Sequence, residues 1–180
     1  LDEGKEVDAI FLDFSKAFDK VDHMKLLHKL DKIGVNSQVT RWVQSLLTGQ
    51  SQTAVVDGYE SSSCLVTSGV PQGSVVGLIL FLVYINNLPD LVLPKTRLFA
   101  DDTVIYNTSD NTQWLQDDLN ALLSWETSWK IEFNPLKCEY VEFSRKHAKG
   151  AENQYRLHNV QITKADGVKY LGVKLESSLR

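Results

Sequence analysis

The sequence predicts an α+β fold in which a small antiparallel sheet is backed by helices. Helical segments and hairpins intermingle along the 180 residues, without the regular strand–helix repeat of a parallel doubly wound sheet. Two segments show clear helical periodicity, and Asp57-Gly58 lies between two short strand-like runs, which is a strong hairpin signal. The length indicates one domain with a substantial core.

The N-terminal part is expected to form a strand followed by a helix. Residues 9–12 are an apolar run that predicts a short buried strand, and Asp13 follows directly at its end. A helix is expected over 23–33, because apolar residues recur there at helical spacing and Gly34 is a typical stop signal. Two further acids precede this helix and are expected to cap it or to lie on the surface: Asp19 and Asp22.

A second helix, a hairpin and a third helix are expected next. Ser37 can cap the second helix. Its apolar face is expected to contain Val39, Trp42, Val43, Leu46 and Leu47. Strands over 52–56 and 63–67 flank the hairpin turn, and Pro71 opens a segment that becomes an apolar helix through Tyr84.

The C-terminal half is expected to hold a tight hairpin, a long helix and short strands. Residues 99–106 form two apolar arms with Asp101-Asp102 at the bend. An amphipathic helix is expected over 112–129, where leucines recur at helical spacing. Short strands are expected over 139–143 and 169–175, separated by polar turns.

The composition excludes several classes of protein. The chain carries 19 Lys plus Arg against 23 Asp plus Glu, a net charge of −4, and it is 43% hydrophobic, which excludes a disordered tail, a collagen-like repeat or a coiled coil. The apolar stretch over 75–85 is shorter than the roughly 18 residues of a membrane span, and residues 1–5 lack signal-peptide character, so an intracellular protein is expected. The two cysteines form no CxxC pair, which argues against a disulfide framework or a zinc site. The densest basic cluster is explained equally by a phosphate-facing surface and by a solvated loop: Arg145, Lys146 and Lys149.

Three acids are the strongest chemical candidates. Asp13 and the Asp101-Asp102 pair each follow an apolar strand that would carry a carboxylate into a cleft. Charges so placed are normally paired, protonated or bound to a metal. If the two strands are neighbours the carboxylates converge, and oxygen-only ligands suit Mg²⁺, two of which, roughly 3.5–4 Å apart, promote phosphoryl transfer. Adjacent acids at a turn are also typical of an ordinary surface, and the residues alone leave both interpretations open.

Five short motifs in a fixed order carry a resemblance to a known family. They are FLDFSKAFDKVDH at 11–23, SGVPQGSV at 68–75, FADD at 99–102, NPLKC at 134–138 and YLGV at 170–173. In sequence, order and spacing they resemble motifs A to E of reverse transcriptases of non-long-terminal-repeat (LINE-type, Jockey/CR1-like) retrotransposons. The resemblance covers nearly the whole chain. It implies a right-hand polymerase palm with part of the fingers, as a single partial domain over 1–180 from which the thumb and most of the fingers are missing.

The resemblance implies an RNA-directed DNA polymerase that joins a dNTP to a primer 3′-hydroxyl. Asp13 and Asp101 would be the principal ligands of two Mg²⁺ ions, for which Mn²⁺ is a possible substitute, and Asp102 would be a weaker ligand. Lys137 would donate a proton to the pyrophosphate leaving group, although a solvated surface lysine explains it nearly as well. The implied partners are an RNA template, a DNA primer and a dNTP, in the nucleus or cytoplasm and without a membrane. Nothing in the sequence indicates a particular oligomeric state.

Further residues are implied to contact the nucleotide and the primer. Phe18, five residues after Asp13, would be a steric gate that excludes a 2′-hydroxyl, and Phe14 would also lie at the nucleotide. Gln72 and Gly73 would contact the nucleotide and template. The primer grip would be a hairpin formed by Tyr170, Leu171 and Gly172. A core phenylalanine, a helix-entry turn and an edge strand are the structural alternatives. The four histidines suit no metal site by their spacing and are assigned no role: His23, His28, His147 and His158.

The chain departs from the family pattern at two positions, and three alternatives stay open. Leu78 stands where the family usually has Pro, and Asn87 where it usually has Asp. The chain begins without Met and is interpreted as a fragment, whose missing parts would supply most of the phosphate-binding charge. The alternatives are a group II intron-type reverse transcriptase, a decayed fragment that at most binds nucleic acid, and a Mg²⁺-dependent phosphohydrolase. The last would leave Phe18 and Gln72 unexplained.

Overall fold

The computed structural model describes residues 6–92, 96–108, 112–144 and 153–178. The chain divides into two compact units, which are described separately. The sheet unit is built from Leu1–Ser15 and Asn87–Arg180, and the helical unit from Lys16–Asn86. The basic cluster noted in the sequence lies outside the described residues: Arg145, Lys146 and Lys149.

The centre of the sheet unit is a five-stranded sheet with the order β11-β8-β1-β7-β6. Its strands are β1 (Val7–Leu12), β6 (Thr96–Phe99), β7 (Asp102–Thr108), β8 (Glu139–Phe143) and β11 (Thr163–Lys164). Neighbours are antiparallel except β11 and β8, which pair in parallel. The predicted small antiparallel sheet is therefore confirmed, apart from one short edge strand.

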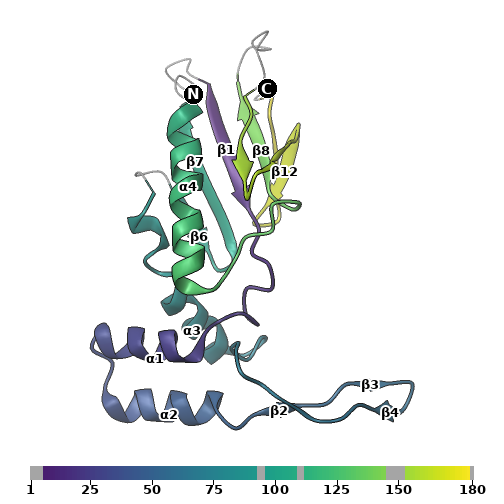
Figure 1. Ribbon diagram of the computed structural model, residues 1–180. Coiled ribbons are helices and arrows are strands. Elements are labelled where there is room, and N and C mark those ends of the chain that lie inside the picture. Colours follow the sequence, from purple (N-terminus) through teal and green to yellow (C-terminus); the bar gives the residue numbers. More distant parts are fainter. Residues whose placement is uncertain (1–5, 93–95, 109–111, 145–152, 179–180) are drawn as a thin grey trace. The chain divides into compact units, whose positions relative to one another are not determined.

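Helix α4 (Thr112–Trp129) lies along this sheet and covers its core (Figure 1). Its bounds are those expected from the leucine spacing, and Leu115, Leu119 and Leu122 are buried. Ile10 of β1 and Ile105 of β7 are also buried, as residues of central strands. A helix-backed sheet was predicted, and it is present. A short 3₁₀ helix, η1 (Leu88–Asp90), precedes β6.

Two small hairpins complete the sheet unit. β9 (Arg156–Leu157) pairs with β10 (Val160–Gln161), and β12 (Gly167–Tyr170) pairs with β13 (Val173–Glu176). The single strand predicted over 169–175 was wrong, because the chain turns in its middle, where Leu171 and Gly172 have φ values of 49° and 80°. Two adjacent left-handed residues make a two-residue hairpin turn. The hairpin that the motif resemblance implied is therefore present.

The helical unit contains α1 (His23–Lys32) and α3 (Val75–Ile85) close to their predicted places. The Asp22 carboxylate caps α1 by accepting the backbone N–H of Lys25 at 3.0 Å. Ser74 caps α3 by accepting the N–H of Gly77 at 2.9 Å. Asp22 therefore has the capping role expected for it.

Helix α2 (Ser37–Leu47) differs from its prediction in cap and in buried face. Asn36, and not Ser37, caps the helix, by accepting the N–H of Gln38 at 2.8 Å. Val39 and Trp42 were expected in the apolar face but are 47% and 54% exposed. The buried residues form a narrower stripe at spacings of three and four: Thr40, Val43 and Leu47. A stripe of this width covers one neighbouring helix, and α1 is the helix that α2 contacts.

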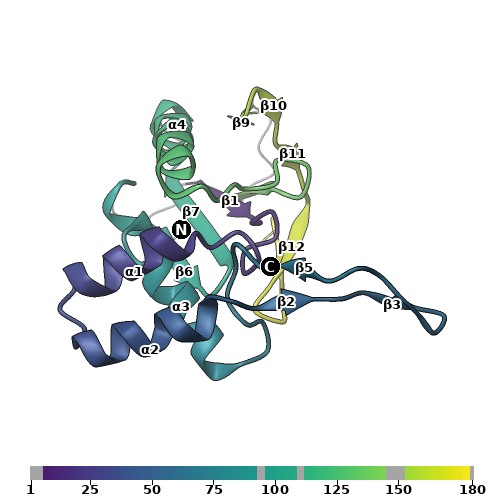
Figure 2. The ribbon, with the colours of Figure 1, turned by 60° about the horizontal axis from the view of Figure 1, so that its bottom comes forward.

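A two-stranded arm joins α2 to α3 (Figure 2). At its base β2 (Ser51–Gln52) pairs with β5 (Cys64–Leu65), and at its tip β3 (Val55–Val56) pairs with β4 (Tyr59–Glu60). The turn is Asp57-Gly58, with φ values of 51° and 83°, as the sequence predicted. The predicted strands are interrupted between base and tip.

Candidate active site

The strand register brings the candidate acids to one end of the sheet. Leu12 at the end of β1 faces Thr103 of β7, so Asp13 lies at the level of Asp102. Phe99 pairs with Asp102 across the β6–β7 hairpin, which leaves Ala100 and Asp101 as its two turn residues. Both acids were predicted at the bend, but only Asp101 lies there, because Asp102 is already the first residue of β7.

The turn before Asp101 is conformationally strained. Ala100 has a φ of 54°, in the left-handed region that residues with a Cβ seldom adopt. Such strain costs on the order of 1 kcal/mol and is common at functional sites. The turn therefore fixes the direction in which the chain presents Asp101.

The three carboxylates form an electrostatically unfavourable group. Burial raises the pKa of Asp102, and the charges of Asp101 and Asp13 raise that pKa further. Asp13 Oδ1 is buried and, among the described residues, accepts no hydrogen bond. The Lys137 Nζ lies 3.4 Å from this oxygen, as an ion pair between an exposed lysine and a half-exposed aspartate. Carboxylates close enough to raise the pKa of Asp102, one of them with a buried oxygen that accepts no hydrogen bond, have the chemistry that a hard divalent cation prefers.

The acid group is not arranged as a complete metal site. Across the described ranges, no group of three or more His, Cys, Asp or Glu side chains is arranged to hold a metal ion. Mg²⁺ usually takes one or two carboxylates and completes its coordination with water and substrate phosphates. Asp13, Asp101 and Asp102 are compatible with this open kind of site.

The segment containing Lys137 is fastened directly to the strand end that carries Asp13. The Asn134 N–H donates to the Asp13 carbonyl at 2.7 Å. Phe14 forms an isolated antiparallel bridge with Phe133, and their rings stack with centroids 4.2 Å apart. Phe14 is only 6% exposed, so its side chain is a core residue and a nucleotide could meet only its backbone.

The third predicted element is the β12–β13 hairpin, whose Tyr170 interacts electrostatically with Asp102. The Tyr170 ring packs edge-on against Phe11, with centroids 5.5 Å apart. Burial raises the pKa of Tyr170, the Asp102 charge raises it further, and Arg97 opposes this effect. Tyr170 is thus close enough to the acid group to feel its charge, while Leu171 and Gly172 form the exposed turn.

The other candidate residues belong to the helical unit. The half-buried Phe18 ring stacks on Phe81 of α3, with centroids 4.6 Å apart. Gln72 and Gly73 are exposed in the turn before α3, where Gly73 has a φ of 85°. The Val70 N–H donates to the Phe18 carbonyl at 2.9 Å, so motifs A and B are joined within this unit.

Glycines and a histidine hold the motif B turn in place. A Cβ on Gly69, whose φ is 95°, would lie 3.0 Å from the Asp19 backbone. His23 Nε2 lies 2.7 Å from the Gly69 carbonyl and must donate to it, because a carbonyl only accepts. His23 was assigned no role from the sequence, yet it is buried and supports motif B.

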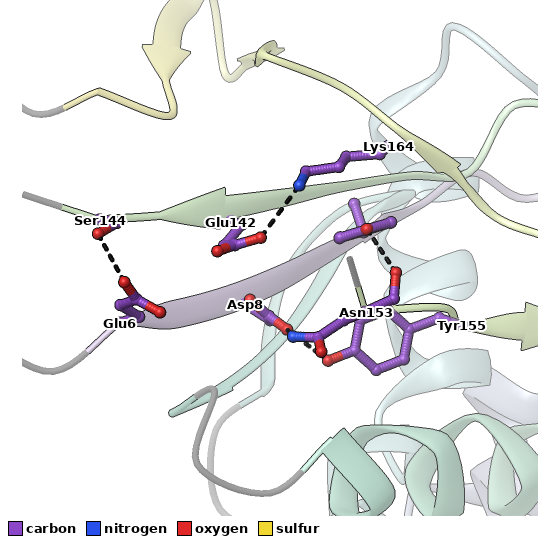
Figure 3. A network of polar contacts seen from close by, with 8 residues as sticks. Glu6, Asp8, Glu142, Ser144, Asn153, Tyr155 and Lys164 are labelled. Atoms are coloured by element: carbon purple, nitrogen blue, oxygen red, sulfur yellow. Dashed lines mark hydrogen bonds and ion pairs between the residues drawn. The ribbon is translucent and has the colours of Figure 1, made fainter. Parts of the chain in front are cut away.

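The sequence also did not reveal a buried polar network around Asp8 (Figure 3). Asp8 is completely buried in β1 and accepts hydrogen bonds from Asn153 Nδ2 at 2.7 Å and from the Tyr155 hydroxyl at 2.5 Å. Tyr140 donates its hydroxyl hydrogen to the Asn153 carbonyl at 2.5 Å. The sequence signal that could have revealed this network is the position of Asp8, an acid directly before the apolar run of β1.

Comparisons with known proteins agree with this geometry. The family described as reverse transcriptase (RNA-dependent DNA polymerase) matches residues 2–175. The chain is similar to the RNA-directed DNA polymerases from mobile element jockey of Drosophila melanogaster, 33% identical over 94% of this chain, and of Drosophila funebris, 29% identical over 99%. It spans 19% and 20% of those two proteins.

A solved structure of apo telomerase from Candida tropicalis, truncated from the C-terminal domain, shows the same fold. It has a TM-score of 0.63 at 10% identity and is matched over 96% of this chain and 34% of its own. The fold and the family match define the class: the chain belongs to the reverse transcriptase family, and its relatives are retrotransposon polymerases. This family uses divalent metal ions and binds a nucleic-acid template and primer. Within the described residues, no helix is long and apolar enough to cross a membrane.

Proposed function

We propose that this chain is the palm-centred catalytic core, with part of the fingers, of a LINE-type RNA-directed DNA polymerase. It would form one partial domain over 1–180 and act inside the cell, in the nucleus or cytoplasm. The observation that carries the proposal is the meeting of Asp13, at the end of β1, with Asp101 and Asp102, at the β6–β7 turn. The reaction is transfer of a deoxynucleotide to a primer 3′-hydroxyl on an RNA template.

In this mechanism Asp13 and Asp101 hold two Mg²⁺ ions, and Asp102 supports them. When bound, the ions activate the attacking hydroxyl and stabilise the leaving oxygen, a task in which Mn²⁺ can replace them. The protein would contribute preorganised carboxylates, since β1 and β7 are interior strands of the sheet and the tight turn at Ala100 carries Asp101. Lys137, whose ammonium lies beside Asp13, would donate a proton to the departing pyrophosphate.

Nucleotide and primer contacts complete the proposal. Phe18 would exclude a 2′-hydroxyl, supported by its stacking on Phe81, which fixes the ring plane. The exposed Gln72 and Gly73 backbone would meet the nucleotide and template, with the buried Phe14 contributing backbone only. The hairpin turn after Tyr170 would grip the primer end, supported by the effect of Asp102 on the pKa of Tyr170.

Primer extension tests this function. The chain is incubated with poly(rA), oligo(dT), dTTP and Mg²⁺, beside Asp101→Asn and the control Asp31→Asn. Asp31 is an exposed acid of α1 in the helical unit, so the control makes the same chemical change at a residue that is not a member of the acid group. Extension by the parent and control, but not by Asp101→Asn, is expected. Equal extension by all three would refute the assignment of Asp101, and no extension by any would favour the inactive-fragment alternative.

A further inference from the structure

Glu126 is a buried carboxylate for which the proposed mechanism has no use. It lies near the C-terminal end of α4 and is 3% exposed. Its Oε1 accepts the backbone N–H of Phe133 at 2.5 Å, and its own carbonyl accepts the N–H of Ile131 at 3.3 Å. A buried carboxylate is costly unless partnered, and here its hydrogen bond reaches the segment that leads to Lys137.

The second partner of Glu126 is His158, from the β9–β10 turn. His158 Nε2 lies 3.0 Å from Glu126 Oε2 and 3.1 Å from Oε1. His158 and Asn159 have φ values of 51° and 62°, the geometry of a type I′ turn that Asn-Gly usually occupies. A histidine in this strained position directs its imidazole at a buried acid. Burial raises the pKa of Glu126, and the Phe133 and His158 contacts oppose that rise.

The hydrogen bond at Phe133 is connected to the acid group through the backbone. Phe133 stacks on Phe14, and the flanking Asn134 N–H binds the Asp13 carbonyl. The Asn134 carbonyl then accepts the N–H groups of Lys137 and Cys138 at 3.0 and 3.1 Å. A displacement of Phe133 would therefore move both partners of the Lys137–Asp13 ion pair.

The β9–β10 hairpin has a second attachment to α4 besides the Glu126–His158 pair. Gln116 of α4 donates from Nε2 to the Arg156 carbonyl at 2.9 Å, and its Oε1 accepts the Arg156 N–H at 2.9 Å. These two bonds hold β9 on the helix. The Glu126–His158 pair can therefore have a separate role. That role concerns Phe133, whose N–H donates to Glu126.

We propose that Glu126 and His158 are positioning residues that fix the Phe133–Lys137 segment against Asp13. Glu126 would hold Phe133, and His158 would donate the hydrogen bond that keeps the buried carboxylate in place. The value of this arrangement for catalysis rests on the proposed polymerase function, because it sets the Lys137 ammonium beside Asp13. The arrangement itself can be tested without any activity.

Cys138 is a built-in reporter for the position of this segment. It is completely buried, whereas Cys64, the other cysteine of the chain, is exposed. In a Cys64→Ser background, the rate at which a thiol reagent labels Cys138 under native conditions measures opening of the segment. The rates are compared among Glu126→Ala, Glu126→Gln, His158→Asn, the double variant Glu126→Gln/His158→Asn, and the control Gln116→Ala.

We expect Glu126→Ala to raise the labelling rate at least about tenfold, because it leaves the buried Phe133 N–H without an acceptor. Glu126→Gln keeps an acceptor oxygen and should stay within about threefold of the parent. His158→Asn should raise the rate, since Asn suits the turn but leaves the buried Glu126 carboxylate without the hydrogen-bond donor of the imidazole. The double variant should restore protection, because it has no buried carboxylate that needs this donor. Gln116→Ala should leave the rate within about twofold.

Three results would overturn the proposal. They are unchanged labelling in Glu126→Ala, no rescue by the double variant, and an equal rise in Gln116→Ala, which would mean that loosening the hairpin is sufficient. If Glu126→Ala fails to fold, the test depends on the labelling rate of His158→Asn and on its recovery in the double variant. Primer extension by the same proteins separates the two proposals. If the Cys138 labelling rates change as expected but no protein extends the primer, only the polymerase function is refuted. If the primer is extended but the labelling rates do not differ among the variants, only the positioning role is refuted.

Discussion

Repulsion among the three site carboxylates should make the metal-free protein less stable than a variant that lacks one of them. Asp102 lies opposite Asp13 in the strand register and next to Asp101 in the chain. The charges of both neighbours raise the pKa of Asp102. Asp102→Asn keeps the size of the side chain and removes its charge. The variant should therefore be more stable than the parent in EDTA, although it is expected to bind cations less tightly.

The size of the effect follows from the register. Side chains at facing positions of neighbouring strands place their carboxylates about 6 Å apart, for which Coulomb's law gives roughly 0.7–1.4 kcal/mol at an effective dielectric constant of about 40–80. Because Asp102 is exposed, solvent and salt reduce this value. We expect a gain in unfolding free energy of about 0.5–1 kcal/mol at low ionic strength, most of which disappears at about 1 M salt.

The assay is urea unfolding in EDTA at pH 7.5, with Asp31→Asn as the control for an isolated surface acid. A group whose folded pKa is raised destabilises the folded state when it ionises, so the gain should shrink as the pH falls through the folded pKa of Asp102. Saturating Mg²⁺, at about 100 times its Kd, should stabilise the parent by about 2.7 kcal/mol and the variant by less. A variant that is less stable than the parent in EDTA, or that gains equally from Mg²⁺, would refute the reasoning.

Three further predictions concern packing, alkaline stability and nucleotide choice. Gly77→Ala should destabilise the chain by about 3 kcal/mol in urea unfolding, because its Cβ would lie 2.0 Å from the Pro71 carbonyl oxygen, and a normal stability would contradict that contact. Burial raises the pKa of Tyr155, so above pH about 10 the unfolded chain ionises first and the unfolding free energy should fall by about 1.4 kcal/mol per pH unit. Tyr155→Phe should lessen that slope, and an identical slope would assign it to other groups. Phe18→Val should raise the ratio of ribonucleotide to deoxynucleotide incorporation by at least about tenfold, and an unchanged ratio would make this ring a packing residue only.

The sequence predicted correctly those elements that are determined by residues close together in the chain. Helix α4 was predicted at about its observed place, because its leucine spacing depends on no other part of the chain. The Asp57-Gly58 turn was likewise predicted from two residues whose φ values are both positive. The strand that carries Asp13 was predicted from a short apolar run, and its position at the centre of the sheet made that run reliable.

Features that depend on distant partners were missed or placed wrongly. Which residues of α2 are buried is decided by its contact with α1, so exposed Trp42 was assigned to the apolar face. The turn at Leu171 and Gly172 was anticipated only from the motif resemblance, because a Leu at positive φ gives no local turn signal. Glu126 and His158 lie 32 residues apart, and only the packing of β9 on α4 shows that they meet. The three residues of the acid group were predicted from the sequence. Their positions relative to one another could be seen only from the register of the paired strands.

Iron-mediated cleavage tests most directly that the acids at the end of β1 and at the β6–β7 turn hold the divalent cations. Fe²⁺ replaces Mg²⁺ in the chain, and ascorbate with peroxide then generates hydroxyl radicals that cut the backbone beside the bound metal. The mechanism predicts cuts near residues 13 and 101–102, suppressed by excess Mg²⁺ and lost in Asp13→Asn. Cuts elsewhere, or an unchanged pattern in Asp13→Asn, would contradict it.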